Sequence, residues 1–137
     1  MAYWIIEGLL ATSPRPGFVP GEEKRVPPEH VEAWVEEKRA AGVRSILCLI
    51  SNDQLPLYRQ LPQGLLDYYR EAGFHVAHLP TYDGMTEPYA PEDYERAWEY
   101  FQQLPKPVLV HCSAGYDRTG RVVRHIVSRL GGDELLE

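Results

Sequence analysis

The chain has 137 residues, of which 44% are hydrophobic, and a formal net charge of −6 at pH 7. This length suits one domain with a real hydrophobic core and leaves no room for a second catalytic domain. The negative charge argues against binding to nucleic acid or to an anionic membrane, because those surfaces attract clustered Lys and Arg. No apolar run is long enough to span a bilayer and the start lacks the basic region of a secretory signal, so we expect a cytoplasmic protein without membrane insertion.

The first half of the chain predicts two strand regions separated by a loop and a helix. Residues 3–11 (YWIIEGLLA) predict one or two short strands, and the Pro- and Gly-rich residues 13–28 predict a loop. A helix is expected from Pro28 to about Gly42, with an apolar face formed by Val31, Trp34 and Val35. Residues 43–50 (VRSILCLI) are apolar enough to form a strand covered on both faces.

The second half continues the alternation of helix and strand. Residues 64–73 (GLLDYYREAG) predict a helix and 74–80 (FHVAHLP) a strand. A helix over 91–104 is followed by a strand over 106–112 (KPVLVHC) and by a last helix with an apolar stripe at Val122, Val123, Ile126, Val127 and Leu130. This order predicts a single-domain α/β fold over residues 1–137, in which a mostly parallel central sheet is flanked by helices on both faces. The domain is either minimal or truncated at its C-terminus.

The segment HCSAGYDRTG (111–120) forms the turn between the last strand and the last helix. Ligands of such folds bind at the carboxyl ends of strands, and a helix N-terminus offers unpaired backbone N–H groups to an anion. The same positive field stabilises a thiolate, here that of Cys112. Arg118 can hold two oxygens of an oxyanion with its planar guanidinium. A nucleophile, an anion cradle and a bidentate clamp together predict attack by sulfur on phosphorus.

The spacing of His111-Cys112, five residues and then Arg118-Thr119-Gly120 resembles the signature loop of the cysteine-based protein tyrosine phosphatases, closest in brevity to small dual-specificity-like members. The resemblance implies that Cys112 forms a phosphocysteine intermediate, that Thr119 hydrogen-bonds the thiolate and that His111 braces the loop. It also implies a phosphate-binding loop that consists of Ser113, Ala114, Gly115, Tyr116, Asp117 and Arg118. We expect no cofactor and no metal, because Arg118 and the backbone amides supply the positive charge.

A leaving alkoxide or phenolate requires a proton from a general acid within hydrogen-bond reach. Asp83 lies in LPTYDGMTEP (79–88), 29 residues before Cys112, and this segment resembles the mobile acid loop of the family. The rival is Asp117, because an acid at that position resembles the loop of myotubularin-type lipid phosphatases. Geometry favours Asp83, since the leaving oxygen points away from the loop that holds the phosphate. Neither aspartate is excluded by the sequence.

The substrate class is less strongly determined. The variable loop positions carry no lysine, which disfavours polyphosphorylated inositides, and Tyr82, Met85, Tyr89 or Tyr116 could wall an aromatic pocket. The sequence therefore favours a monomeric protein tyrosine or dual-specificity phosphatase, with a phosphorylated protein or a small phosphomonoester as its partner. The alternatives are a phosphoinositide or inositol phosphate phosphatase and, as a non-enzyme, a phosphate-binding pseudophosphatase or adaptor. The intact nucleophile argues against the adaptor.

The second cysteine, Cys48, is expected on the strand adjacent to the one that precedes Cys112. Packing is the simpler interpretation of a buried cysteine. In some relatives, a cysteine on such a strand protects the oxidised nucleophile through a disulfide, which requires Cα atoms within about 7 Å.

Overall fold

The computed structural model describes residues 3–80, 89–114 and 117–131, with Asp117 described by its backbone alone. Its centre is a five-stranded sheet in the order β1-β2-β5-β3-β4. The strands are β1 (Tyr3–Ile6), β2 (Leu10–Thr12), β3 (Ser45–Cys48), β4 (His75–His78) and β5 (Val108–His111). Only β1 and β2 pair antiparallel, and the other three pairings are parallel. The predicted α/β fold with a mostly parallel sheet is confirmed.

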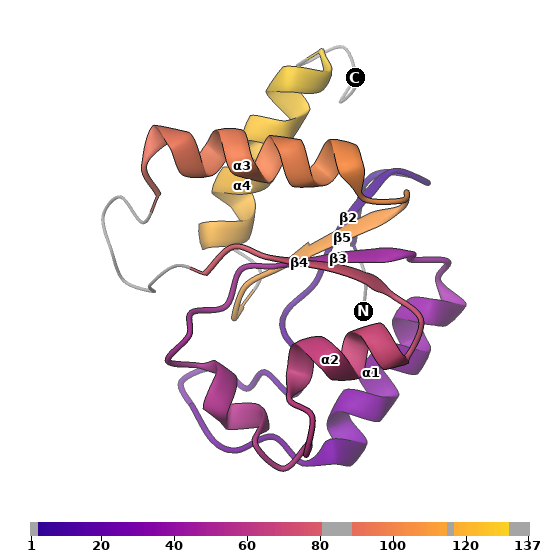
Figure 1. Cartoon of the computed structure of the whole chain (residues 1–137), viewed down its shortest axis with the longest axis vertical. Helices are drawn as coiled ribbons and strands as arrows, with labels where there is room; N and C mark the ends of the chain where they lie inside the picture. The colour runs from indigo at the N-terminus through magenta and orange to yellow at the C-terminus, as the bar shows by residue number, and fades with distance from the viewer. Residues whose placement is uncertain (1–2, 81–88, 115–116, 132–137) are drawn as a thin grey trace.

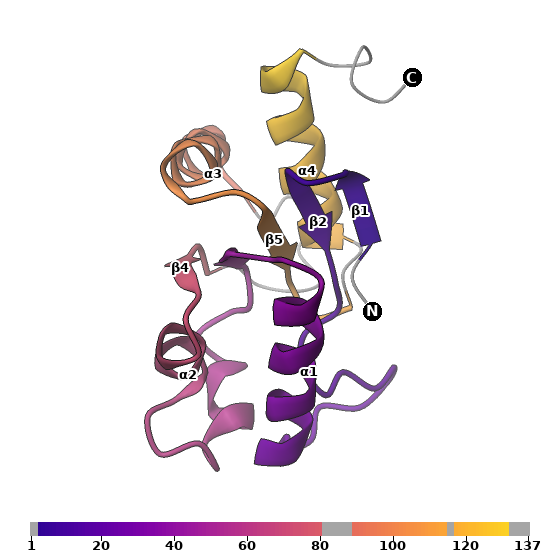
Figure 2. The ribbon, with the colours of Figure 1, turned by 90° about the vertical axis from the view of Figure 1, so that its right-hand side faces the viewer.

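Four α-helices cover the sheet, two on each face (Figure 1). Helices α1 (Pro28–Ala40) and α2 (Leu65–Glu71) lie on one side, and α3 (Pro91–Gln103) and α4 (Asp117–Leu130) on the other, as Figure 2 also shows. All four helices were expected from the sequence. The short 3-10 helix η1 (Leu55–Tyr58) was not expected, because a four-residue segment has no apolar periodicity to detect. Of the helices described, none has the length and hydrophobicity needed to cross a membrane.

Local sequence explains where the long helices begin and end. Pro28 occupies the first turn of α1, where its missing N–H would have had no helical partner. The chain leaves α1 through Gly42, whose φ of +91° lies in the left-handed region that favours glycine. At the start of α3, the carboxylate of Asp93 accepts a hydrogen bond of 3.0 Å from the backbone N–H of Ala90. These signals fix the ends of α1 and the start of α3.

The sheet separates two hydrophobic layers. The layer under α3 and α4 contains Leu47, Val110 and Phe101, and the layer under α1 and α2 contains Ile46 and Leu109. Successive residues of β3 and β5 therefore point to alternate faces, so both strands are buried on both sides. This is the pattern that the apolar sequences of these strands predicted.

Candidate active site

The strand β5 lies inside the sheet between β2 and β3, and the candidate loop begins where β5 ends. Cys112 directly follows the last residue of β5 and is buried, with 3% of its surface exposed. The backbone enters α4 at Asp117. A strand thus delivers Cys112 to the N-terminus of a helix, where backbone N–H groups and the helix dipole favour a bound anion.

Arg118 is completely buried in the first turn of α4. Its Nη1 donates to the carbonyl of Leu49 over 3.3 Å, and its Nη2 donates to Oε1 of Gln54 over 3.3 Å. Leu49 directly follows β3, and its N–H donates to the carbonyl of His111, the residue before Cys112. The guanidinium is therefore held at the same edge of the sheet as the thiol. These two acceptors are neutral, so the contacts orient the guanidinium without adding a negative charge to it.

Thr119 follows Arg118 in the first turn of α4 and is also completely buried. Its Oγ1 has no hydrogen-bond partner within the described part of the chain. A buried hydroxyl without a partner costs free energy unless another group accepts its proton. Such a hydroxyl is suited to donate to a thiolate or to a leaving sulfur.

His111 is buried against the α1–α2 layer. Its Nδ1 lies 3.0 Å from the carbonyl oxygen of Cys112 and its Nε2 lies 3.0 Å from the hydroxyl of Tyr69. A carbonyl can only accept, so we assign the ring proton to Nδ1, and Nε2 accepts from Tyr69. Burial, together with the nearby cations Arg15, Arg118 and Lys38, lowers the pKa of His111 to about 4. A neutral ring that fixes the Cys112 carbonyl fits the bracing role expected for His111.

A polar network surrounds Ser113, the residue after the candidate nucleophile. Its Oγ lies 2.6 Å from Nε2 of Gln54 and 3.2 Å from Nε of Arg15, and both nitrogens donate to it. The same Nε2 of Gln54 donates to Glu23 over 2.9 Å. The sequence did not predict the roles of Gln54 and Arg15, because they come from distant loops and neither belongs to a recognisable motif.

Several predicted site residues lie outside the described part of the structure. They are Asp83, Gly115, Tyr116 and the side chain of Asp117, so the structure gives no geometry for either candidate acid. Of the proposed pocket walls, Tyr82 and Met85 also lie outside it. Tyr89 is 2% exposed and packs in the α3–α4 layer, edge-on to Tyr94 with ring centroids 5.4 Å apart. Ala114 is described and is partly buried at the start of the loop.

Cys48 ends β3 and Cys112 directly follows the neighbouring strand β5, as the sequence predicted, but their side chains belong to different layers. Cys48 is in register with His111 on β5, and both pack toward α1 and α2. Cys112, one residue further, packs in the layer under α3 and α4. Burial raises the pKa of the Cys48 thiol to about 12. Both cysteines are free thiols, and the position of Cys48 fits a packing role.

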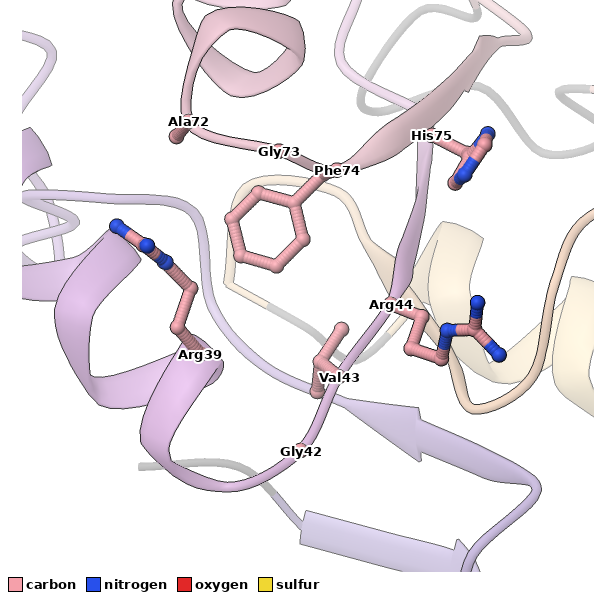
Figure 3. Close-up of a pocket in the computed structure, with 8 residues that line it drawn as sticks. All are labelled: Arg39, Gly42, Val43, Arg44, Ala72, Gly73, Phe74 and His75. Atoms are coloured by element: carbon pink, nitrogen blue, oxygen red, sulfur yellow. The ribbon is translucent and has the colours of Figure 1, made fainter.

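A separate cavity of about 400 Å³ lies at the opposite edge of the sheet, where β3 and β4 begin (Figure 3). Phe74 and Val43 lie between Arg39 on one side and Arg44 with His75 on the other. The cysteine and Arg118 are at the carboxyl ends of the strands, so this cavity is not part of the candidate active site.

Comparisons with known proteins agree with this geometry. A model of the tyrosine phosphatase family matches residues 26–135. The solved structure of kinase associated phosphatase (KAP) is 24% identical and has a TM-score of 0.69, with 90% of this chain and 66% of that one covered. The active form of Tk-PTP is 21% identical, has a TM-score of 0.66 and is matched over 98% of this chain and 79% of its own.

A third solved structure is the core catalytic domain of the PP-IP phosphatase SIW14 from S. cerevisiae. It is 19% identical, with a TM-score of 0.58, and the match covers 89% of this chain and 61% of that one. At these identities, the three likenesses show the fold alone. No curated protein sequence gives a significant match.

Proposed function

The chain belongs to the tyrosine phosphatase family and is a cysteine-based phosphatase, and from this premise we propose that it hydrolyses phosphotyrosine in proteins through a phosphocysteine intermediate. The observation that carries the proposal is the placement of Cys112 and Arg118 at one edge of the sheet. Both are buried where β5 meets α4, and the guanidinium is fixed there by Leu49 and Gln54. We propose the same residues for the catalytic steps below.

In the first step, the thiolate of Cys112 attacks phosphorus in line with the ester oxygen. The S–P bond forms as the P–O bond breaks, and the leaving oxygen takes a proton from a general acid, for which Asp83 is our candidate and Asp117 the rival. Arg118 and the loop amides, from Ser113 to Arg118, bind the three non-bridging oxygens. The alcohol or phenol then leaves.

In the second step, water attacks the phosphocysteine. The S–P bond breaks and the sulfur leaves as a thiolate, to which the buried hydroxyl of Thr119 donates a hydrogen bond. The proton of the attacking water returns to the carboxylate formed in the first step. The sum is one phosphomonoester and one water giving one alcohol and inorganic phosphate, so no external acid or base is consumed.

Replacement of the nucleophile tests this mechanism. Cys112→Ser should abolish hydrolysis of para-nitrophenyl phosphate yet still bind inorganic phosphate, because a serine hydroxyl is not ionised at this site. Cys48→Ala removes the other thiol, which lies on the opposite face of the sheet, and should retain activity. Wild-type activity should resist EDTA and should be inhibited by vanadate, which imitates the transition state. Full activity in Cys112→Ser would refute the mechanism, and phosphate binding without any hydrolysis by the wild type would favour an adaptor.

One observation favours a second candidate, an inositol phosphate phosphatase. Arg15, which contacts Ser113, also lines a cavity of about 220 Å³ whose other lining residues include Lys24, Arg25 and His30, together with Glu22, which pairs with Lys24 over 3.0 Å. Basic side chains beside the loop suit a substrate with more than one phosphate. The likeness in fold to the PP-IP phosphatase SIW14 is compatible with this alternative.

A substrate panel separates the two candidates. We expect the highest kcat/KM for phosphotyrosine peptides, above phosphoserine peptides, phosphoinositides and inositol phosphates, because the variable loop positions carry no lysine. The double variant Lys24→Gln/Arg25→Gln should leave phosphotyrosine turnover unchanged. A preference for an inositol phosphate, lost in this double variant, would instead support the second candidate.

A further inference from the structure

Arg15 is a cation buried behind the candidate phosphate-binding loop. It lies in the loop after β2, and only 2% of its surface is exposed. Its backbone N–H donates to the carbonyl of Ser113 over 2.8 Å, and its Nε donates to Oγ of the same residue over 3.2 Å. One residue from the loop after β2 therefore holds both the main chain and the side chain of Ser113, next to Cys112.

The charge of Arg15 is not neutralised locally. Its Nη1 donates to the hydroxyl of Tyr58 over 3.1 Å, and that hydroxyl donates to the carbonyl of Pro16 over 2.6 Å. Burial raises the pKa of Tyr58 to about 12, so this partner is neutral at physiological pH. The rings of Tyr58 and Phe18 lie 6.0 and 5.7 Å from the guanidinium carbon. Within residues 3–80, 89–114 and 117–131, no carboxylate forms an ion pair with Arg15.

A buried cation without a paired anion is unfavourable, because desolvation of the charge is not offset. A phosphate dianion in the loop beside Ser113 would provide that missing negative charge. Gln54 strengthens the connection, since it donates to Ser113 Oγ and accepts from Arg118. Two donors, Arg15 and Gln54, thus hold Ser113 Oγ. Gln54 also orients Arg118, the arginine that is expected to bind phosphate.

We propose that Arg15 is a positioning residue of the phosphate site: it holds Ser113 in place directly after Cys112, and it adds a second buried positive charge next to Ser113. This inference rests on the proposed function for the identity of the anion. Arg15 acts through Ser113 and contributes no group to the chemical steps.

The inhibition constants of vanadate and inorganic phosphate test the proposal, measured with para-nitrophenyl phosphate as substrate. Arg15→Met should raise both constants about tenfold to a hundredfold, the range expected for a charge-assisted hydrogen bond. Arg15→Lys keeps the charge without the planar geometry and should fall between wild type and Arg15→Met. Arg39→Met, at the opposite edge of the sheet, removes a half-exposed arginine and should leave both constants unchanged.

Unfolded enzyme in equilibrium with the folded state would raise an apparent inhibition constant, so both constants are measured well below the melting temperature of each variant, where they separate positioning from stability. A merely structural role would lower the melting temperature and the apparent kcat of Arg15→Met but leave both constants at the wild-type values. That result in a folded variant would overturn the proposal. If Arg15→Met does not fold, Arg15→Lys decides in the same way, since wild-type constants there would also overturn it.

A double-mutant cycle tests the route through Ser113. If Arg15 acts through Ser113 Oγ, the losses in Arg15→Lys and Ser113→Ala should overlap, and the double variant should bind vanadate little worse than the weaker single variant. Strict additivity would refute this route. If the wild type hydrolyses no phosphomonoester, the proposed function fails, but calorimetric binding of inorganic phosphate to wild type and Arg15→Met still decides the role of Arg15.

Discussion

His111 shows how a residue next to the candidate nucleophile can support the site without a chemical role of its own. The sequence could place it beside Cys112, but its partners come from α1 and α2, which no local pattern connects to it. Tyr69 donates to its ring, and Trp34 packs edge-on against it with centroids 5.5 Å apart. The ring is thereby kept neutral and its Nδ1 proton is directed at the Cys112 carbonyl. This supports a structural brace and disfavours a general base.

The buried neutral histidine predicts how stability depends on pH. Because the pKa of His111 falls from 6.5 in the unfolded chain to about 4 in the fold, the unfolded chain binds the extra proton between these values. The contribution of neutral His111 to the free energy of unfolding should therefore be fully present above pH 6.5. It should be lost as the pH falls toward 4, which lowers the free energy of unfolding by about 3 kcal/mol. Denaturant unfolding at several pH values measures the effect.

His111→Gln should be less stable at neutral pH and should lose much of this acid sensitivity. His30→Gln, which removes an exposed histidine on α1, is the control and should keep the wild-type slope. Equal slopes for wild type and His111→Gln would show that other groups cause the acid sensitivity.

The identity of the general acid is also a question about single residues. We expect Asp83→Asn to lose about 10²- to 10⁴-fold in kcat on phosphotyrosine and less on an aryl phosphate with a good leaving group. The alkaline limb of its pH profile should flatten. Asp117→Asn should mainly weaken substrate binding, because Asp117 directly precedes Arg118. If only Asp117→Asn shows the dependence on leaving group, Asp117 is the acid and the loop is myotubularin-like.

The elements themselves were largely predictable. Strands β3 and β5 lie in short, mostly apolar runs, and α3 and α4 carry clear apolar stripes, so run length and helical periodicity were sufficient for these elements. The insertion of β5 between β2 and β3 was not predictable in this way, because strand order depends on contacts distant in sequence. That insertion brings the loops after β2 and β3 to both sides of the signature loop. The contacts of Arg15 and Gln54 with Ser113 are its consequence.

The register of β3 and β5 predicts the fate of the two thiols under oxidation. Cys48 pairs with His111 rather than with Cys112, so the two thiols are directed to opposite faces of the sheet. A disulfide would require the backbone at the end of β3 or β5 to rotate, so that both thiols point to the same face of the sheet. After mild peroxide, mass spectrometry should find Cys112 oxidised, Cys48 as a free thiol and no peptide that links them. A Cys48–Cys112 linked peptide would show that the strand end rearranges and would support redox protection.

At the scale of the whole molecule, two hydrophobic layers share one sheet. Trp34 packs against the α1–α2 layer, and Trp98 packs against the α3–α4 layer. The sequence predicted helices on both faces, but it could not say which helices share a face, since that depends on the crossovers between parallel strands. Because β3 and β5 contribute side chains to both layers, unfolding of either strand would expose both layers to water.

This shared sheet predicts a single cooperative unfolding transition, reported equally by tryptophans on both faces. A variant with Trp34 alone (Trp4→Phe/Trp98→Phe) reports on the first layer, and one with Trp98 alone (Trp4→Phe/Trp34→Phe) reports on the second. Within each variant, the urea midpoint from fluorescence should equal that from far-ultraviolet circular dichroism. The comparison is made inside each variant because Trp34→Phe removes a hydrogen bond of 3.0 Å to the Pro14 carbonyl, which should cost about 1 kcal/mol and shift both probes together. A fluorescence midpoint that departs from the dichroism midpoint in either variant would show that the two layers unfold separately.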